Sequence, residues 1–323
     1  MSFSRRAFLG GGLAAPATLR AGLTLTGAGL AVPLAATRAR AEPKSHSFRL
    51  GDSEIIVLSD GGLSLPASTL ASNVPEAERA AFLQANGDDP NTRASALNIT
   101  LIRRGDALVL VDTGAGMNFF ETAGQLADSF EEAGIDREAV THVVLTHAHP
   151  DHVWGIIDDF DETERFPNAA YLIGAAEWDF WMDPDFISGN PEVLHSFALG
   201  AQRNLGAVAE KTERVGADHA VVPGVTMIAT PGHTPGHMSV LVEDGGQQLL
   251  VLGDALTHPA VSFARPDWQP STDQLPEVAV ATRKQLLDRA ATDELLLIGY
   301  HLPWPGVGRA EVKDGAWRYV PAS

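Results

Sequence analysis

The sequence predicts an α/β fold in which two mixed β-sheets pack face to face, with helices on their outer sides. Pairs of short apolar runs are joined by tight turns that contain glycine and aspartate, such as Gly51-Asp52 and Asp314-Gly315. These turns indicate antiparallel hairpins and exclude a purely parallel sheet. Stretches with helical spacing separate the groups of strands, which is typical of helices that cover sheets. With 323 residues, 45% of them hydrophobic, the chain can bury a sizeable core.

The first half of the chain is expected to be rich in strands. Six apolar or β-branched runs predict strands, at His46–Leu50, Glu54–Leu58, Ala96–Arg103, Ala107–Val111, His142–Thr146 and Ala169–Ile173. Helices are expected at Pro75–Asn86 and Asn118–Ala133, and the second would end at Gly134. The rest of Gly61–Pro90 is expected to form a loop.

The second half begins with helices and ends with strands. A helix through Glu177 and Trp181 is expected to be followed by a loop at Asp183–Gly189 and a helix at Glu192–Gly206. Strands are then predicted at Val221–Ala229, Met238–Glu243, Gln247–Leu252 and Leu295–Ile298. An amphipathic helix is expected at Asp273–Ala291, and a last hairpin at Gly308–Val320.

The first residues are typical of an export signal rather than of a folded domain. Ser4–Gly10 contains a twin-arginine pattern, a stretch rich in Gly, Ala and Leu follows, and Ala39-Arg40-Ala41 resembles a cleavage site. Arg20 and the many glycines argue against a membrane-spanning helix. We therefore predict a Tat signal peptide at residues 1–41, a mature domain at residues 42–323 without a membrane segment, and a periplasmic location.

Charge and cysteine content exclude several classes of function. The formal net charge is −18, so the chain would repel a phosphate backbone, and nucleic acid is not expected as a partner. The chain has no cysteine, which rules out disulfides, thiolate ligands and cysteine nucleophiles.

The stretch Thr146–His152 concentrates potential metal ligands. His147, His149, Asp151 and His152 lie within six residues, directly after a predicted buried strand. His147 and His149 point to the same side of an extended chain, and Asp151 and His152 can face a second point nearby. Four such donors cannot crowd one tetrahedral ion that also keeps a water molecule, so the spacing suggests two metal ions in one cleft.

Three further donors follow predicted strands elsewhere in the chain. His233 lies in a turn framed by proline and glycine, Asp254 follows a strand and a glycine, and His301 follows the last strand of the predicted core. Together with the first cluster they make five histidines and two aspartates, a set that suits divalent metal ions.

These motifs resemble the metallo-β-lactamase superfamily. The resemblance rests on Asp112 in Val-Asp-Thr-Gly, the 147–152 loop, His233 in Pro-Gly-His-Thr-Pro-Gly-His, Asp254 in Leu-Gly-Asp-Ala, and His301. It covers most of the chain after the predicted signal and implies an αβ/βα sandwich. Within the superfamily, the segments 253–259, 263–268 and 301–308 are most similar to the methyl parathion hydrolase and lactonase-like group.

The resemblance also implies a role for each ligand. His147, His149 and His233 would hold one ion, while Asp151, His152 and His301 would hold the other. Asp254 would bridge the ions, and Asp112 would orient the histidine loop. Zinc is the expected metal, although manganese, cobalt or iron suits similar donors.

The implied activity is hydrolysis of a small-molecule substrate. A hydroxide bridging the two ions would attack an ester, a lactone or a phosphotriester, with Asp151 and Asp254 as the catalytic side chains. Alternatives are a thioesterase like glyoxalase II, a persulfide dioxygenase-like enzyme with one iron, or a metal-binding protein without catalytic activity. The resemblance points to a homodimer.

The remaining histidines and several aromatic residues have weaker signals. His237 is expected to make structural hydrogen bonds, and His258 either supports Asp254 or caps a loop. The histidines expected at structural or surface positions are His46, His142, His195 and His219. Four aromatic residues either line an apolar pocket or pack between helices, namely Phe119, Trp178, Trp181 and Phe197.

Overall fold

Each half of the chain builds its own β-sheet in the computed structural model, which describes residues 44–322. The first sheet has seven strands in the order β1-β2-β3-β4-β5-β6-β7, and the second has seven in the order β14-β13-β12-β11-β10-β9-β8. The strands of the first sheet are β1 (Ser45–Leu50), β2 (Ser53–Pro66), β3 (Thr92–Arg104), β4 (Ala107–Val111), β5 (His142–Leu145), β6 (Ala170–Gly174) and β7 (Thr212–Val215). Those of the second are β8 (His219–Val222), β9 (Val225–Ala229), β10 (Met238–Asp244), β11 (Gln247–Val251), β12 (Leu296–Ile298), β13 (Val307–Lys313) and β14 (Ala316–Pro321).

Both sheets are mixed. In the first, β1 to β4 pair antiparallel and β4 to β7 pair parallel. In the second, only the β11–β12 pair is parallel among the described strands. Parallel neighbours require a crossover, and the helices of the fold supply it.

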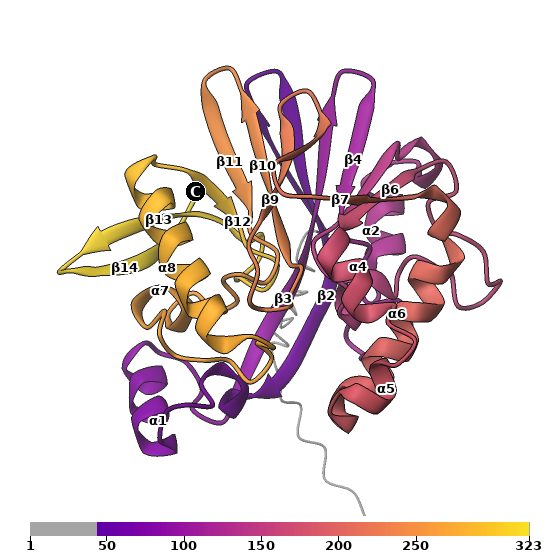
Figure 1. The fold of residues 1–323 in the computed structure, drawn as a ribbon. Coiled ribbons are helices and arrows are strands. Elements are labelled where there is room, and N and C mark those ends of the chain that lie inside the picture. Colours follow the sequence, from indigo (N-terminus) through magenta and orange to yellow (C-terminus); the bar gives the residue numbers. More distant parts are fainter. Residues whose placement is uncertain (1–43, 323) are drawn as a thin grey trace, which may run out of the picture. The chain divides into compact units, whose positions relative to one another are not determined.

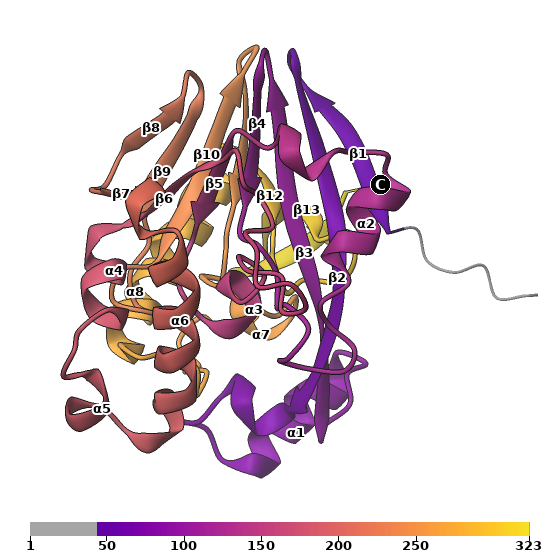
Figure 2. The ribbon, with the colours of Figure 1, turned by 90° about the vertical axis from the view of Figure 1, so that its right-hand side faces the viewer.

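Helices cover the outer face of each sheet. Figure 1 shows α7 and α8 beside the second sheet and α2, α4 and α6 beside the first, and Figure 2 shows α4 and α6 from the side. The α-helices are α1 (Glu76–Ala85), α2 (Leu126–Glu132), α3 (Pro150–Val153), α4 (Ala175–Trp181), α5 (Phe186–Gly189), α6 (His195–Ala207), α7 (Val261–Ala264) and α8 (Pro276–Thr292). Short 3-10 turns occur at Ala67–Leu70, Arg137–Ala139, Glu192–Leu194 and Ala209–Lys211. The arrangement confirms the predicted fold class.

The alternation of side chains along β5 explains why the first sheet is covered on both faces. In β5, Val143 packs with the core under the helices of the first sheet, whereas Val144 packs between the two sheets. Neighbouring residues of a strand point to opposite faces, so a strand that is apolar on both sides must be covered on both sides. This burial fixes the end of β5, from which the histidine loop leaves.

Several segments differ from the predicted elements. The loop expected at Asp183–Gly189 ends in the short helix α5, and β7 lies where no strand was expected. Strand β2 continues through a bulge between Ser59 and Gly62 and reaches Pro66, where a loop was expected. The helix expected at Asn118–Ala133 begins only at Leu126, because Gly124 has a φ of +76° that ends the helical pattern. The strand expected at Val221–Ala229 is a hairpin, and Gly224 turns the chain with a φ of +83°.

The predicted signal peptide lies outside the described residues, as does the start of the mature domain predicted at residue 42. Both remain predictions. Within residues 44–322, no helix is long and apolar enough to cross a membrane.

Candidate metal centre

Asp112 anchors the loop that carries most of the candidate ligands. It follows β4 and is itself fully buried. Its Oδ1 accepts a hydrogen bond from the Thr146 backbone N–H at 2.7 Å, and its Oδ2 accepts one from the Thr146 hydroxyl at 2.8 Å. The same Oδ2 accepts from His152 Nδ1 at 2.8 Å. The His152 ring is thereby fixed with its Nε2 free to face the cluster.

The first half-site consists of three imidazoles. His147 Nε2 and His233 Nε2 each lie 3.0 Å from His149 Nδ1. Ligand atoms held about 2.0–2.1 Å from a tetrahedral zinc ion are about 3.3 Å apart, so this spacing suits one ion. Burial lowers the pKa of His147 and of His149 well below the usual range, which leaves both rings neutral. Neutral imidazole is the form that binds metal.

The second half-site combines two imidazoles with carboxylates. His301 Nε2 lies 3.3 Å from Asp151 Oδ2 and 3.1 Å from Asp254 Oδ2. His152 Nε2 lies 3.2 Å from Asp254 Oδ1, yet neither of these two buried atoms has a hydrogen-bond partner within the described residues. An ion between them would satisfy both.

Asp254 stands between the half-sites. Its Oδ2 is 3.4 Å from His233 Nε2 on one side and 3.1 Å from His301 Nε2 on the other. Burial alone would lower the pKa of His301, but Asp254 and Asp151 raise it to about 9. The carboxylates therefore attract positive charge at this point, as a cation site requires. The structure brings all seven predicted ligands together, and their donor set fits two divalent ions.

Three groups meet the geometric requirement for a metal ion within the described residues. Their ligand atoms lie within 4.8 Å of one another and all their side chains are buried. The groups are His147 with His149 and His233, His147 with His152 and Asp254, and Asp151 with His152 and His301.

Asp273 supports His233 from outside the cluster, a contact that the sequence did not reveal. Its Oδ1 accepts from His233 Nδ1 at 3.0 Å, and its Oδ2 accepts from Arg283 at 2.7 Å. This pair holds the His233 ring so that its Nε2 faces the other ligands. Asp273 precedes α8 and looks like an ordinary surface acid in the sequence.

Glu177 is a second unpredicted support. This buried carboxylate accepts four hydrogen bonds: from the Ala148 and Gly236 backbone N–H groups, the Trp181 indole and the Thr234 hydroxyl. It therefore ties α4 to the 147–152 loop and to the His233 turn. Gly236 has to be glycine at this contact, because a Cβ there would lie 2.0 Å from the Glu177 backbone nitrogen.

A pocket of about 580 Å³ opens onto the cluster. His149, Asp151, His233, Asp254 and His301 line its floor. Its walls are largely apolar and include Leu63, Leu65, Phe119, Phe180, Leu194 and Phe197. Of the four aromatic residues singled out in the sequence, Phe119 and Phe197 line this pocket, whereas Trp178 and Trp181 are buried in the core.

The other histidines have structural contacts. His237 donates from Nδ1 to the Thr230 carbonyl and accepts at Nε2 from the Asp254 backbone N–H, 2.9 Å away. Burial lowers the pKa of His237 to about 3, so it stays neutral. His258 caps a loop, since its Nδ1 accepts from the Ala260 and Val261 backbone N–H groups. The histidines that belong to none of the candidate metal groups within residues 44–322 include His46, His142, His195 and His219.

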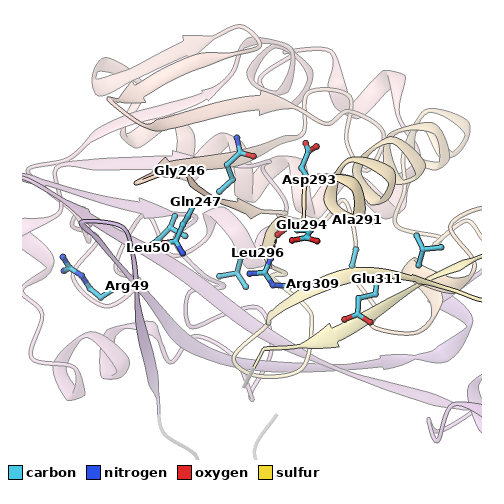
Figure 3. Close-up of a pocket in the computed structure, with 13 residues that line it drawn as sticks. Arg49, Leu50, Gly246, Gln247, Ala291, Asp293, Glu294, Leu296, Arg309 and Glu311 are labelled. Carbon is cyan, nitrogen blue, oxygen red and sulfur yellow. Dashed lines mark hydrogen bonds between the residues drawn. The ribbon is translucent and has the colours of Figure 1, made fainter.

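Another cavity, of about 770 Å³, lies away from the cluster, and none of the seven predicted ligands lines it. Figure 3 shows Arg49 from β1, Gln247 from β11 and Arg309 from β13 around it. The Arg309 side chain donates to the Glu294 carbonyl, and Gln247 accepts from the Gly51 backbone N–H. These polar groups are already engaged with protein partners, so the cavity lacks the chemistry of the metal cluster.

Among proteins of known description, the chain is similar to lactonases and metallo-hydrolases. It is 30% identical over 184 residues to a probable metallo-hydrolase of Mycobacterium tuberculosis, which covers 50% of this chain and 57% of the relative. It is 31% identical over 128 residues to the N-acyl homoserine lactonase AttM of Agrobacterium fabrum, which covers 39% of this chain and 44% of that protein. The chain thus spans about half the length of the curated relatives it matches.

Solved structures match over a larger share of the chain. AidC, a dizinc quorum-quenching lactonase in complex with the product N-hexanoyl-L-homoserine, has a TM-score of 0.81 and 30% identity. That match covers 87% of this chain and 99% of AidC. The hydrolase AbOPH has a TM-score of 0.81 and 26% identity, and covers 88% of this chain and 99% of AbOPH.

The family model of the metallo-β-lactamase superfamily matches residues 93–301, a range that contains every candidate ligand. The matched range runs from the second residue of β3 to His301, just after β12. The resemblance inferred from the motifs is thereby confirmed, and the chain belongs to the metallo-β-lactamase superfamily.

Proposed function

We propose that the protein is a dinuclear-metal hydrolase whose principal substrates are lactones, with aryl esters and phosphotriesters as related substrates. The observation that carries this proposal is the convergence of seven nitrogen and oxygen ligands on two half-sites that share Asp254, at the floor of an apolar pocket. The similarity to the lactonases AttM and AidC supports the choice of lactones.

The chain's own residues would hold the ions in a fixed arrangement. His147, His149 and His233 suit one ion, and Asp151, His152 and His301 suit the other. When bound, two divalent ions supply an activated water molecule and polarise the oxygen of the scissile group.

Positioning is the contribution of the surrounding side chains. Asp254 contacts His233 of one half-site and His301 of the other, so its carboxylate would be shared between them. Asp112 and Asp273 fix the rings of His152 and His233, so little reorganisation is needed on binding. The apolar walls around Phe119 and Phe197 exclude water and suit an acyl or aryl group.

The test is a substrate panel on metal-loaded protein, with the metal content measured in the same sample. We expect two ions per chain and hydrolysis of an acyl-homoserine lactone, with weaker hydrolysis of an aryl acetate and a paraoxon-type triester. S-lactoylglutathione serves as the substrate of the thioesterase alternative. A single iron per chain with persulfide oxidation, or two ions without hydrolysis of any ester, lactone or triester, would refute the proposal.

A further inference from the structure

Arg93 is a buried arginine without an acidic partner. It stands near the start of β3, opposite Leu65 of β2, and is 6% exposed. Its Nε donates to the Ser95 hydroxyl at 2.9 Å. Within residues 44–322, its two Nη atoms make no hydrogen bond, and no carboxylate oxygen lies within 4.0 Å of the guanidinium.

Two of the other three buried arginines among the described residues have an acidic partner, whereas Arg79 donates to the Ala71 carbonyl instead. Arg283 is paired with Asp273 at 2.7 Å, and Arg165 lies 3.5 Å from Asp158. A guanidinium keeps its charge in a protein, and a buried charge without a partner costs several kcal/mol. The two Nη atoms of Arg93 have no protein partner but are not fully enclosed, so they are open to the pocket that Arg93 lines.

The guanidinium of Arg93 lies at the wall of the pocket that opens onto the candidate metal centre. Arg93 lines the same 580 Å³ pocket as Asp151, Asp254 and His301. Burial lowers the pKa of Arg93, while Asp254 and Asp151 oppose that effect through space. Arg93 thus lies within electrostatic reach of the metal centre but is not bonded to its ligands.

No described residue accepts a hydrogen bond from the Nη atoms of Arg93, which leaves them available to a bound molecule. Leu65, the cross-strand neighbour of Arg93, and Leu63, two residues before it on β2, also line the pocket and carry no side-chain acceptor. Resting on the proposed function, we propose that Arg93 is a specificity-determining residue that binds a carbonyl-type oxygen on the arm of the substrate. An amide carbonyl or a carboxylate supplies that oxygen, and the apolar walls hold the adjoining hydrocarbon chain.

The test uses three γ-lactones with arms of equal length: a plain alkyl arm, an N-acyl amide arm and an arm that ends in a carboxylate. Arg93→Met is expected to lower kcat/KM about 10- to 100-fold on the amide or the carboxylate lactone, as for loss of a charged hydrogen bond. On the alkyl lactone the change should stay below about threefold, since no acceptor is lost. The lactone with the larger loss identifies the acceptor, and Arg93→Lys should recover part of the activity.

A matched control is Arg79→Met. Arg79 is another buried arginine, but it donates to the Ala71 carbonyl and does not line the pocket. Arg79→Met should leave the ratios of kcat/KM among the three lactones unchanged. Arg93→Met should unfold at a urea concentration no lower than that of the wild type, because it removes an unpaired buried charge. An equal loss on all three lactones, no loss on any, or a clearly lower urea midpoint would overturn the proposal.

A binding measurement keeps this inference separate from the proposed function. Calorimetric titration of metal-loaded protein with the three ring-opened products requires no turnover. If the wild type hydrolyses no lactone, the proposed function fails. A preference for the amide or carboxylate product that Arg93→Met abolishes would still support the role of Arg93, and equal binding of all three products would refute it.

Discussion

Glu177 Oε1 accepts a hydrogen bond from the backbone N–H of Ala148, 2.9 Å away, and Ala148 lies between the candidate ligands His147 and His149. The other oxygen of Glu177 accepts from Thr234, the residue after His233. One buried side chain therefore spaces the two loops that form the first half-site. It touches no candidate ligand ring in the described contacts.

Glu177→Gln should weaken metal binding at the first half-site. All four partners of Glu177 are donors, so the amide NH₂ of glutamine would face a donor and leave it unpaired. We expect a loss of about 1–3 kcal/mol in the free energy of unfolding and about 10- to 100-fold weaker binding of one ion. Urea unfolding and competition with a chelator measure the two effects. Trp181→Phe, which removes only one donor, is the control and should retain two tightly bound ions.

Asp273→Asn should loosen His233. The amide oxygen can still accept from His233 Nδ1, but the charge that holds both His233 and Arg283 is lost. Metal affinity should fall about 10- to 100-fold, as is typical for partners of metal-binding histidines. The matched control is Asp244→Asn, because Asp244 pairs with Arg104 at the same 2.7 Å on a hairpin away from the cluster. Equal metal affinities in the two variants would contradict this role for Asp273.

His149→Ala and Asp254→Ala should each abolish turnover while the fold stays mostly intact. His149 Nδ1 faces both His147 and His233, and Asp254 reaches both half-sites. We expect activity to fall by more than about 100-fold, because losing a ligand costs more than losing a residue that supports one. Circular dichroism and metal content should accompany the kinetics. His142→Ala, on strand β5 just before the histidine loop but outside the candidate metal groups, should keep its activity. Near-normal hydrolysis by either ligand variant would refute the assignment.

His258 should make stability sensitive to acid. Burial and the charge of Arg93 lower the pKa of His258 from 6.5 to about 4 in the folded protein. Between these pH values the unfolded chain binds a proton that the folded chain does not. The contribution of His258 is therefore fully present above pH 6.5 and is lost as the pH falls toward 4, by at most about 1.4 kcal/mol per pH unit.

His258→Asn isolates this effect, because the asparagine oxygen can accept from the same two backbone N–H groups without titrating. Urea unfolding at pH 7 and pH 5 should show a smaller loss of stability for the variant than for the wild type. The same loss in both proteins would show that His258 does not titrate in this way.

The sequence was informative where ligands follow strands in short motifs. The 147–152 loop, His233, Asp254 and His301 were found because each motif is local and the strand before it is strongly apolar. Asp273 and Glu177 could not be found in this way, since each bonds to residues distant in the chain, and nothing local to Arg93 distinguishes it from a surface arginine. Their burial and partners exist only after the two sheets have packed.

The errors in the predicted elements also have physical causes. The segment at Asn118–Ala133 has helical spacing, but Phe119 packs edge to face with Phe197 and Trp154. Contacts with other parts of the fold, and not the spacing, therefore set the conformation at Phe119. The hairpin at Val221–Ala229 could have been recognised from Pro223-Gly224, a dipeptide that marks turns. Tertiary packing decided the first case and turn chemistry the second.

The separation of the chain into two sheets has a consequence for assembly. Four candidate ligands follow β5 of the first sheet, two in the loop and two in α3, and the other three follow strands β9, β11 and β12 of the second. Ions bound between them would hold the N-terminal and C-terminal halves together, in addition to the apolar contacts between the sheets. If the chain is cleaved at residues 216–218, between β7 and β8, its two fragments should associate with higher affinity in the presence of divalent metal than with a chelator.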